Sequence, residues 1–116
     1  MYYLLIDPAK KTVLAENLQI ASNPLQRMSG LLGKNYLPYG EGLLLVPCNS
    51  IHTFFMRFPI DILFLDRFYK VLRIVENLQP YRLALHLKAF QTVELPAGTV
   101  CKLNTEVGSN LTLLKN

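Results

Sequence analysis

The sequence predicts an α+β domain in which a mainly antiparallel, strongly curved sheet forms a sandwich or partly closed barrel with one or two short helices. Apolar runs of strand length outnumber helical patterns, and most connections between them are short, as antiparallel pairing allows. Hydrophobic residues make up 51% of the 116 positions and charged residues 17%, so the chain can bury a core. No repeat, low-complexity stretch or Gly/Ser-rich linker divides it, and we expect a single domain over residues 1–116.

The first elements read as a hairpin followed by a helix. Tyr2–Ile6 is short, aromatic and apolar, turn residues follow, and a second extended run covers Thr12–Ala21. Asn23 and Pro24 suit the cap and first position of a helix, and Gln26 can complete a capping box. The same pattern predicts one apolar helix face and a helix end at a glycine: Leu25, Met28, Leu32 and Gly33.

Beyond Gly42 the pattern changes to strands. Consecutive apolar runs cover Leu43–Val46, Ile51–Met56, Ile60–Leu65 and Tyr69–Val75. Both alternating sets of Ile60–Leu65 are mostly apolar, which predicts a central strand with Ile62 and Phe64 in the core. The Tyr69–Val75 run carries two basic residues, which places it nearer an edge.

The last third of the chain predicts further strands and one short helix. Asn77–Lys88 is interrupted by Pro80 and then alternates leucines with other residues, which favours a loop followed by a half-buried strand. Phe90–Leu95 and Leu111–Leu114 are predicted strands. Between them, a turn at residues 96–98 opens a short predicted helix with Val100 and Leu103 facing inward.

Composition narrows the class of protein. No apolar stretch approaches the ~20 residues of a membrane span, and the start lacks the features of a signal peptide, so we expect a soluble, cytoplasmic protein. Cys48 and Cys101 are far apart and belong to no paired motif, and we expect two reduced thiols. The net charge is +4, but the basic residues are scattered, so nucleic acid is not an expected partner.

Four segments together resemble the domain of unknown function 192 (DUF192) family, a group of small bacterial and archaeal proteins. They are Gln26–Leu32, Gly42–Leu45, Phe54–Asp66 and Val93–Gly98. The central segment is the specific one, because it combines an aromatic-Met-basic run with Pro-Ile-Asp and an apolar strand. The resemblance covers the chain from Leu25 onward and implies a compact α+β fold with a curved sheet, but no established activity, cofactor or catalytic set.

Two positions depart from the pattern that this resemblance implies. Tyr69 stands where a glycine is usual in the hairpin after Asp66, which leaves the turn type open. Gly108-Ser109 replaces the common Gly-Asp, which removes a carboxylate that would have been a candidate ligand.

Functional side chains are densest between residues 48 and 61. We predict that any site involves Cys48, Ser50, His52, Arg57 and Asp61. The interpretation that we favour is a binding or interaction module whose cleft or sheet edge in this region takes a small anionic ligand or a protein partner. The alternative is a small hydrolase or transferase that uses His52 with Cys48, Ser50 or Asp61.

Each candidate residue also has an ordinary structural interpretation. In an extended segment Cys48 and His52 lie about 13 Å apart, so a nucleophile–base pair requires a bend. Cys48 suits a small buried hydrophobe, and His52 a half-buried imidazole bonded to a carbonyl. The cysteines and histidines lack the spacing of a zinc site, so we expect no metal and no cofactor. Arg57 and Asp61 are predicted to form a structural ion pair across the Phe58-Pro59 corner.

Overall fold

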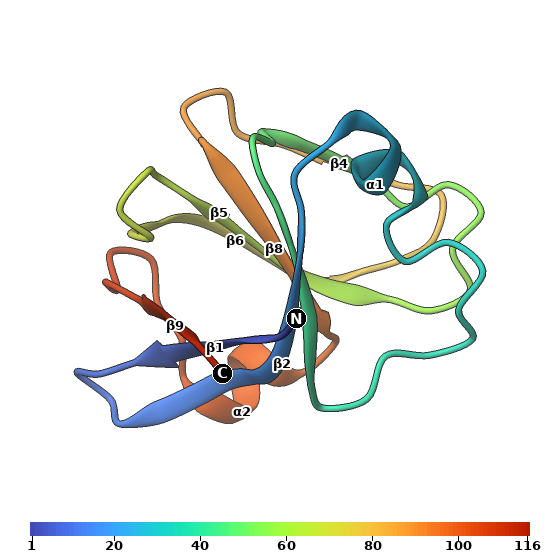
Figure 1. The fold of residues 1–116 in the computed structure, drawn as a ribbon. Helices are drawn as coiled ribbons and strands as arrows, with labels where there is room; N and C mark the ends of the chain where they lie inside the picture. The colour runs from blue at the N-terminus through green and yellow to red at the C-terminus, as the bar shows by residue number, and fades with distance from the viewer.

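The computed structural model describes residues 1–116, except for the side chain of Met28. Figure 1 shows helix α1 and strand β4 together on one side of the molecule, and helix α2 beneath strands β1 and β2. The elements in chain order are β1 (Tyr3–Asp7), β2 (Thr12–Ala21), α1 (Pro24–Ser29), β3 (Gly40–Leu45), β4 (Ser50–His52), β5 (Ile60–Leu65), β6 (Val71–Leu78), β7 (Leu83–Leu85), β8 (Gln91–Pro96), α2 (Thr99–Leu103) and β9 (Thr112–Lys115). Within the described residues, neither helix has the length and apolar character needed to cross a membrane.

Seven strands form one open mixed sheet in the order β6-β5-β8-β3-β2-β1-β9, and β4 and β7 form a separate two-stranded ribbon. All pairs are antiparallel except β2 with β3, which run parallel. The prediction of mainly antiparallel pairing with short helices is therefore confirmed. The predicted strong curvature and the sandwich or partly closed barrel are wrong, because the sheet stays open and the segments next to its end strands β6 and β9 meet only at one isolated bridge, between Lys70 and Asn110.

The core consists of two apolar clusters, and β5 contributes to both. Leu63 and Leu65 pack in one cluster, whereas Ile60, Ile62 and Phe64 pack in the other. Successive strand side chains point to opposite faces, so this division places one cluster on each side of β5. All six β5 residues are buried, which confirms the predicted central strand and the core positions of Ile62 and Phe64.

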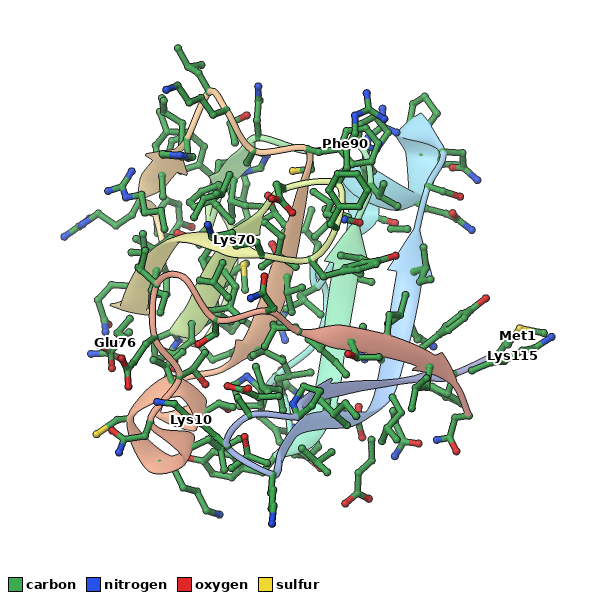
Figure 2. The ribbon with its side chains drawn as sticks, turned by 90° about the vertical axis from the view of Figure 1, so that its left-hand side faces the viewer. Met1, Lys10, Lys70, Glu76, Phe90 and Lys115 are labelled. Atoms are coloured by element: carbon green, nitrogen blue, oxygen red, sulfur yellow. The ribbon has the colours of Figure 1, made fainter. Side chains whose placement is uncertain are left out.

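The N-terminal hairpin and the helix cap are as predicted. Asn23 accepts a hydrogen bond from the Gln26 N–H at 2.8 Å, and the Gln26 side chain accepts from the Ser22 N–H at 3.1 Å. At the other side of the molecule, the Lys10 ammonium donates to the carbonyl of Asn104 and pairs with Glu106, which ties the β1–β2 turn to the residues after α2 (Figure 2).

The predicted end of the first helix and its apolar face need correction. Helix α1 ends at Gly30, whose φ is 43° and whose N–H bonds to the Gln26 carbonyl, and not at Gly33. Leu25 is 75% exposed and Leu32 lies beyond the helix, while Leu31 is buried instead. The predicted inward position of Met28 concerns a side chain outside the described part of the structure. A helix this short has too few turns to form a continuous apolar face. The buried apolar contact therefore comes from Leu31, just after the helix.

Two other strand predictions changed in detail, and the structure also gives the conformation of the turn at Tyr69. The run Ile51–Met56 contains only the short β4, because residues 53–56 form a turn in which the Met56 N–H donates to the Thr53 carbonyl. Strand β7 exists, but it exposes Leu83 and Leu85 and buries Ala84, the reverse of what a half-buried leucine strand would do. Tyr69 has a φ of 68°, the left-handed conformation that glycine adopts without strain.

Candidate functional site

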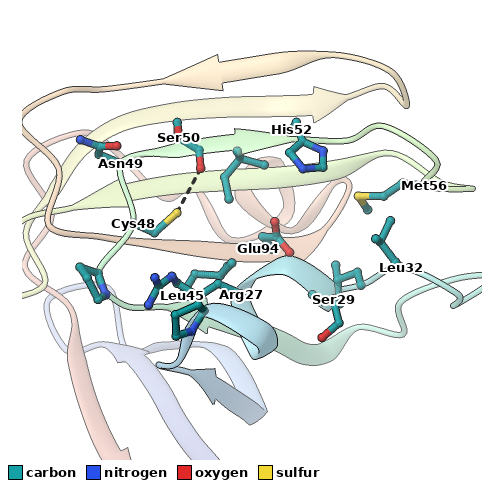
Figure 3. A pocket seen from close by; sticks show the side chains of 15 residues that line it. Arg27, Ser29, Leu32, Leu45, Cys48, Asn49, Ser50, His52, Met56 and Glu94 are labelled. Carbon is teal, nitrogen blue, oxygen red and sulfur yellow. Dashed lines mark hydrogen bonds between the residues drawn. The ribbon is translucent and has the colours of Figure 1, made fainter.

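A cavity of about 360 Å³ lies between helix α1, the segment that precedes and includes β4, and strand β8. Figure 3 shows β4 along one side of it and α1 along the other, with Glu94 between them. The volume is at the lower end of the range for small-molecule sites, about 300–1,000 Å³. Its apolar wall consists of Leu31, Leu45, Ile51 and Met56, all from the cluster that covers this face of the sheet.

Glu94 is the central polar group of the cavity. It belongs to β8, where Val93 and Leu95 point to the opposite face and pack in the other core cluster. The residue is 5% exposed, and no described side chain or backbone group forms a hydrogen bond with its carboxyl group. Burial raises the pKa of Glu94 from 4.5 to about 8, because the charged form loses its hydration without gaining a partner. At pH 7 the group is therefore mainly a neutral carboxylic acid that can donate a hydrogen bond.

The remaining polar groups of the cavity are one guanidinium and several neutral side chains. Arg27 comes from α1, and one of its guanidinium nitrogens donates to the Ser22 carbonyl at 3.0 Å. Four further N–H groups of that fork are available for other acceptors. The side chains of Asn49 and Ser50 add groups that can donate or accept around the same space, whereas the Ser29 hydroxyl already donates to the Gln26 carbonyl at 3.2 Å. With Glu94 protonated, the described lining carries one permanent positive charge and no negative charge at pH 7.

Three of the five predicted site residues line this cavity together: Cys48, Ser50 and His52. The Cys48 thiol donates to the Ser50 carbonyl at 3.1 Å, as the dashed line in Figure 3 marks. The His52 ring stacks on Phe54 with ring centroids 5.3 Å apart. The thiol and imidazole thus have separate contacts, and no nucleophile–base hydrogen bond joins the described side chains of Cys48, Ser50 and His52.

Arg57 and Asp61 lie outside the cavity, and the predicted ion pair between them is wrong. Arg57 donates to the Asn35 side chain at 2.6 Å. Asp61 is fully buried, and its two oxygens accept from the N–H groups of Asn77 at 2.8 Å and Val100 at 2.9 Å. The alternation of β5 explains the difference, because it directs Asp61 to the same buried side as Leu63 and Leu65, where backbone amides replace the guanidinium as partners.

In the part of the chain that the structure describes, the cavity contains neither a cluster of metal ligands nor a hydrogen-bonded nucleophile–base pair. Among the described residues, no three His, Cys, Asp or Glu side chains come close enough to hold a metal ion. Asp61 is also unavailable as an orienting carboxylate for His52, since both of its oxygens are bonded to backbone amides. What the cavity offers is a protonated carboxyl, a guanidinium and several donors above an apolar wall.

The five predicted site residues do not include Glu94 or Arg27. Glu94 carries a signal that could have been used: it is the one charged residue within the otherwise uncharged run of Gln91–Pro96, where a buried strand leaves no ordinary place for a carboxylate. Arg27 carries no such signal, because a basic residue on a short exposed helix is usually solvated.

Comparison with known proteins agrees with the fold and with the sequence resemblance. Residues 6–113 match the DUF192 family, described as Uncharacterized ACR. A UPF0127 protein of Pyrococcus abyssi is 30% identical over 114 residues, which cover 93% of this chain and 95% of the relative. A UPF0127 protein of Thermococcus sibiricus is 29% identical, with 93% of this chain and 73% of the relative covered.

Two crystal structures share the fold. A candidate transcription regulator from Sinorhizobium meliloti 1021 superimposes with a TM-score of 0.83 at 24% identity, covering 95% of this chain and 90% of the other. A protein of unknown function from Novosphingobium aromaticivorans gives a TM-score of 0.79 at 19% identity, covering 95% and 82%. At these identities the two structures support the fold alone. Because the family match extends over nearly the whole chain, this protein belongs to the DUF192 family of uncharacterised proteins.

Proposed function

We propose that this domain is a binding module that takes a small organic acid into the cavity between α1, β4 and β8. The observation that carries the proposal is the Glu94 carboxyl, which is buried, lacks a protein partner among the described groups, and opens into the cavity. A ligand that supplies the missing hydrogen bond adds about 0.5–1.5 kcal/mol to binding, or about 1.5–3 kcal/mol if the ligand group is charged.

Charge favours an anion over a cation. Protonated Glu94 donates one hydrogen bond to a ligand carboxylate, and Arg27 offers a planar fork that matches a carboxylate in a bidentate way. The Arg27 guanidinium would repel a ligand ammonium. Glu94 would not offset this repulsion, because its carboxyl group is neutral at pH 7. The apolar wall of Leu31, Leu45, Ile51 and Met56 suits a short aliphatic tail on the acid.

Calorimetry with 4-methylpentanoate and 4-methylpentanamide tests the proposal, because the two compounds differ only at the acid group. We expect the acid to bind and the amide to bind at least about tenfold more weakly. Arg27→Met is expected to weaken binding of the acid by a similar factor, whereas Arg82→Met, outside the cavity, is the matched control and leaves it unchanged. Equal binding of the acid and the amide would count against an acid-binding site.

The pH dependence of binding gives an independent test. If the ligand requires protonated Glu94, the dissociation constant is flat at neutral pH and rises tenfold per unit above a pKa near 8. Glu94→Gln is expected to remove this rise, while Glu76→Gln, at an exposed position of β6, retains it. Alkylation provides the local readout: 4-methylpentanoate should protect Cys48, which lines the cavity, and leave Cys101 unprotected.

The alternative of a small hydrolase or transferase rests on His52 and finds less support. Its nucleophile candidates Cys48 and Ser50 make no hydrogen bond to the imidazole in the described contacts, and Asp61 is occupied elsewhere. Burst release from an activated ester that disappears in His52→Gln, with the fold preserved, would favour the enzyme over the binding module.

A further inference from the structure

One edge of strand β4 points its backbone groups away from β7. The Asn49 carbonyl accepts from the His86 N–H and the Thr53 N–H donates to the Arg82 carbonyl, each at 2.9 Å, at the two ends of the ribbon. Because bonded and non-bonded pairs alternate along an antiparallel ladder, Ile51 is the bonded position between them. The N–H and C=O groups of Ser50 and His52 therefore point outward, and the thiol bond from Cys48 to the Ser50 carbonyl agrees with that direction.

This outward edge borders the cavity. The lining includes every residue from Pro47 to His52, so the backbone and not one face of the strand forms that wall. In the part of the chain that the structure describes, β4 pairs with β7 alone. Helix α1 stands opposite, as Figure 3 shows, and the result is a groove between a helix and an unpaired strand edge. An unpaired edge is a template on which an extended peptide can add as a further strand.

The surroundings suit the alternating side chains of such a peptide. On the inner side of β4 lies the apolar wall of the cavity, around Ile51 and Met56. Past the rim of the cavity runs a row of aromatic rings, in which Phe54 stacks on His52 and Tyr81 lies between Phe54 and Phe55, with centroids 5.3–6.3 Å apart.

Two residues of the aromatic row are exposed and also have strained backbone conformations. Phe55 is 71% exposed and Tyr81 is 56% exposed. Both have left-handed φ values, 67° and 63°, which are strained for aromatic residues. Strained residues that hold apolar rings in solvent are typical of a surface that contacts a partner.

We infer that the acid recognised in the cavity is the C-terminal carboxylate of an extended peptide, which pairs as an added strand with the free edge of β4. This inference rests on the proposed acid-binding function and goes beyond it. The edge offers the N–H groups of Ser50 and His52 and the His52 carbonyl, while the Ser50 carbonyl already accepts from the Cys48 thiol, so it fits the end of a chain and not a long strand. The carboxylate meets Glu94 and Arg27, and the residues that precede it lie along β4.

The probes are acetyl-leucyl-alanyl-leucine, its C-terminal amide, and the three peptides that carry one N-methyl group at each amide in turn. In a strand, successive N–H groups point in opposite directions, so N-methylation is expected to alternate in effect along the peptide. Methylation of an amide that faces β4 should weaken binding at least about fivefold, and methylation of its neighbours should not. The C-terminal amide is expected to bind at least about tenfold more weakly than the acid.

Ser50→Pro tests the edge from the side of the protein. Its N–H lies outside the β4–β7 ladder, so proline removes a donor to the peptide without removing a bond of the ribbon. Ser50→Ala is the matched control, because it removes the same hydroxyl from the cavity but keeps the N–H. Relative to Ser50→Ala, we expect the peptide affinity of Ser50→Pro to fall about fivefold or more, while the two variants bind 4-methylpentanoate equally. The N-methyl series decides the matter if this variant does not fold.

The outcomes separate the two proposals. If 4-methylpentanoate binds but the tripeptide is no tighter, and N-methylation has the same effect at every position, the peptide inference is overturned and the acid-binding function stands. A tripeptide amide that binds as tightly as the acid also overturns it. If neither the acid nor the peptides bind, the proposed function fails and the inference fails with it.

Discussion

At the scale of single residues, the burial of Glu94 makes the free energy of unfolding depend on pH. Its folded-state pKa of about 8 lies above the unfolded value of 4.5, so folding takes up a proton between these values. The free energy of unfolding is therefore highest below pH 4.5 with respect to this group and decreases as pH rises through 8. One pKa unit corresponds to about 1.4 kcal/mol, so the full decrease is on the order of 5 kcal/mol.

We predict that Glu94→Gln removes most of this decrease. Urea unfolding of the variant should show a nearly constant free energy between pH 5 and pH 9, and at pH 9 the variant should be more stable than the parent by several kcal/mol. The other charged or titratable residues that line the cavity are Arg27, Cys48 and His52, and they are present in both proteins. Glu76→Gln serves as the exposed control, and a parallel loss of stability in all three proteins would contradict the burial argument.

Asp61 and Arg57 give a second residue-scale prediction, because the structure assigns them separate partners. Asp61→Ala leaves two buried N–H groups without acceptors and is expected to cost about 2–5 kcal/mol. Arg57→Met loses one exposed hydrogen bond to Asn35 and is expected to change stability by less than about 0.5 kcal/mol. A double-mutant cycle in urea should return a coupling energy near zero, whereas coupling above about 0.5 kcal/mol would restore the ion pair.

At the scale of elements, β5 is the strand on which both core clusters depend. Phe64 is fully buried, and Phe64→Ala is expected to cost about 3–5 kcal/mol. The chain supplies a matched control four residues later, since Phe68 in the β5–β6 turn is 82% exposed and Phe68→Ala should cost less than about 0.5 kcal/mol. Urea midpoints measure both, and equal midpoints for the two variants would mean that β5 does not face the core as described.

At the scale of the whole molecule, the reactivity of the two cysteines measures how accessible each thiol is and whether it is reduced. Both are free in the structure, Cys101 exposed and Cys48 partly buried with its thiol bonded to the Ser50 carbonyl. We predict two alkylatable thiols in the unreduced protein, with Cys101 reacting faster than Cys48. Mass spectrometry after timed alkylation measures this, and the absence of free thiols would contradict the expected reducing compartment as well.

The sequence alone determined most of the local structure. The hairpin, the Asn23 cap, the fully buried β5 and the strand at residues 91–96 follow from turn chemistry and apolar periodicity, which act over a few neighbouring residues. The turn type at Tyr69 stayed open at the sequence level, and its left-handed φ agrees with the glycine that the family resemblance implies at this position. The stretch from 48 to 52 was also identified, because polar side chains are dense there.

Only the tertiary structure decided what surrounds those side chains. Glu94, Arg27 and His52 come from three separate segments, and their meeting depends on the pairing of β8 with β3 and β5 and on the placement of the β4–β7 ribbon. The pKa of Glu94 follows from burial by elements distant in sequence. Spacing along the chain suggested a partner for Asp61, but the face to which β5 directs it supplied backbone amides instead. Periodicity predicts that a side chain is buried, whereas the packing of distant segments decides which groups it meets.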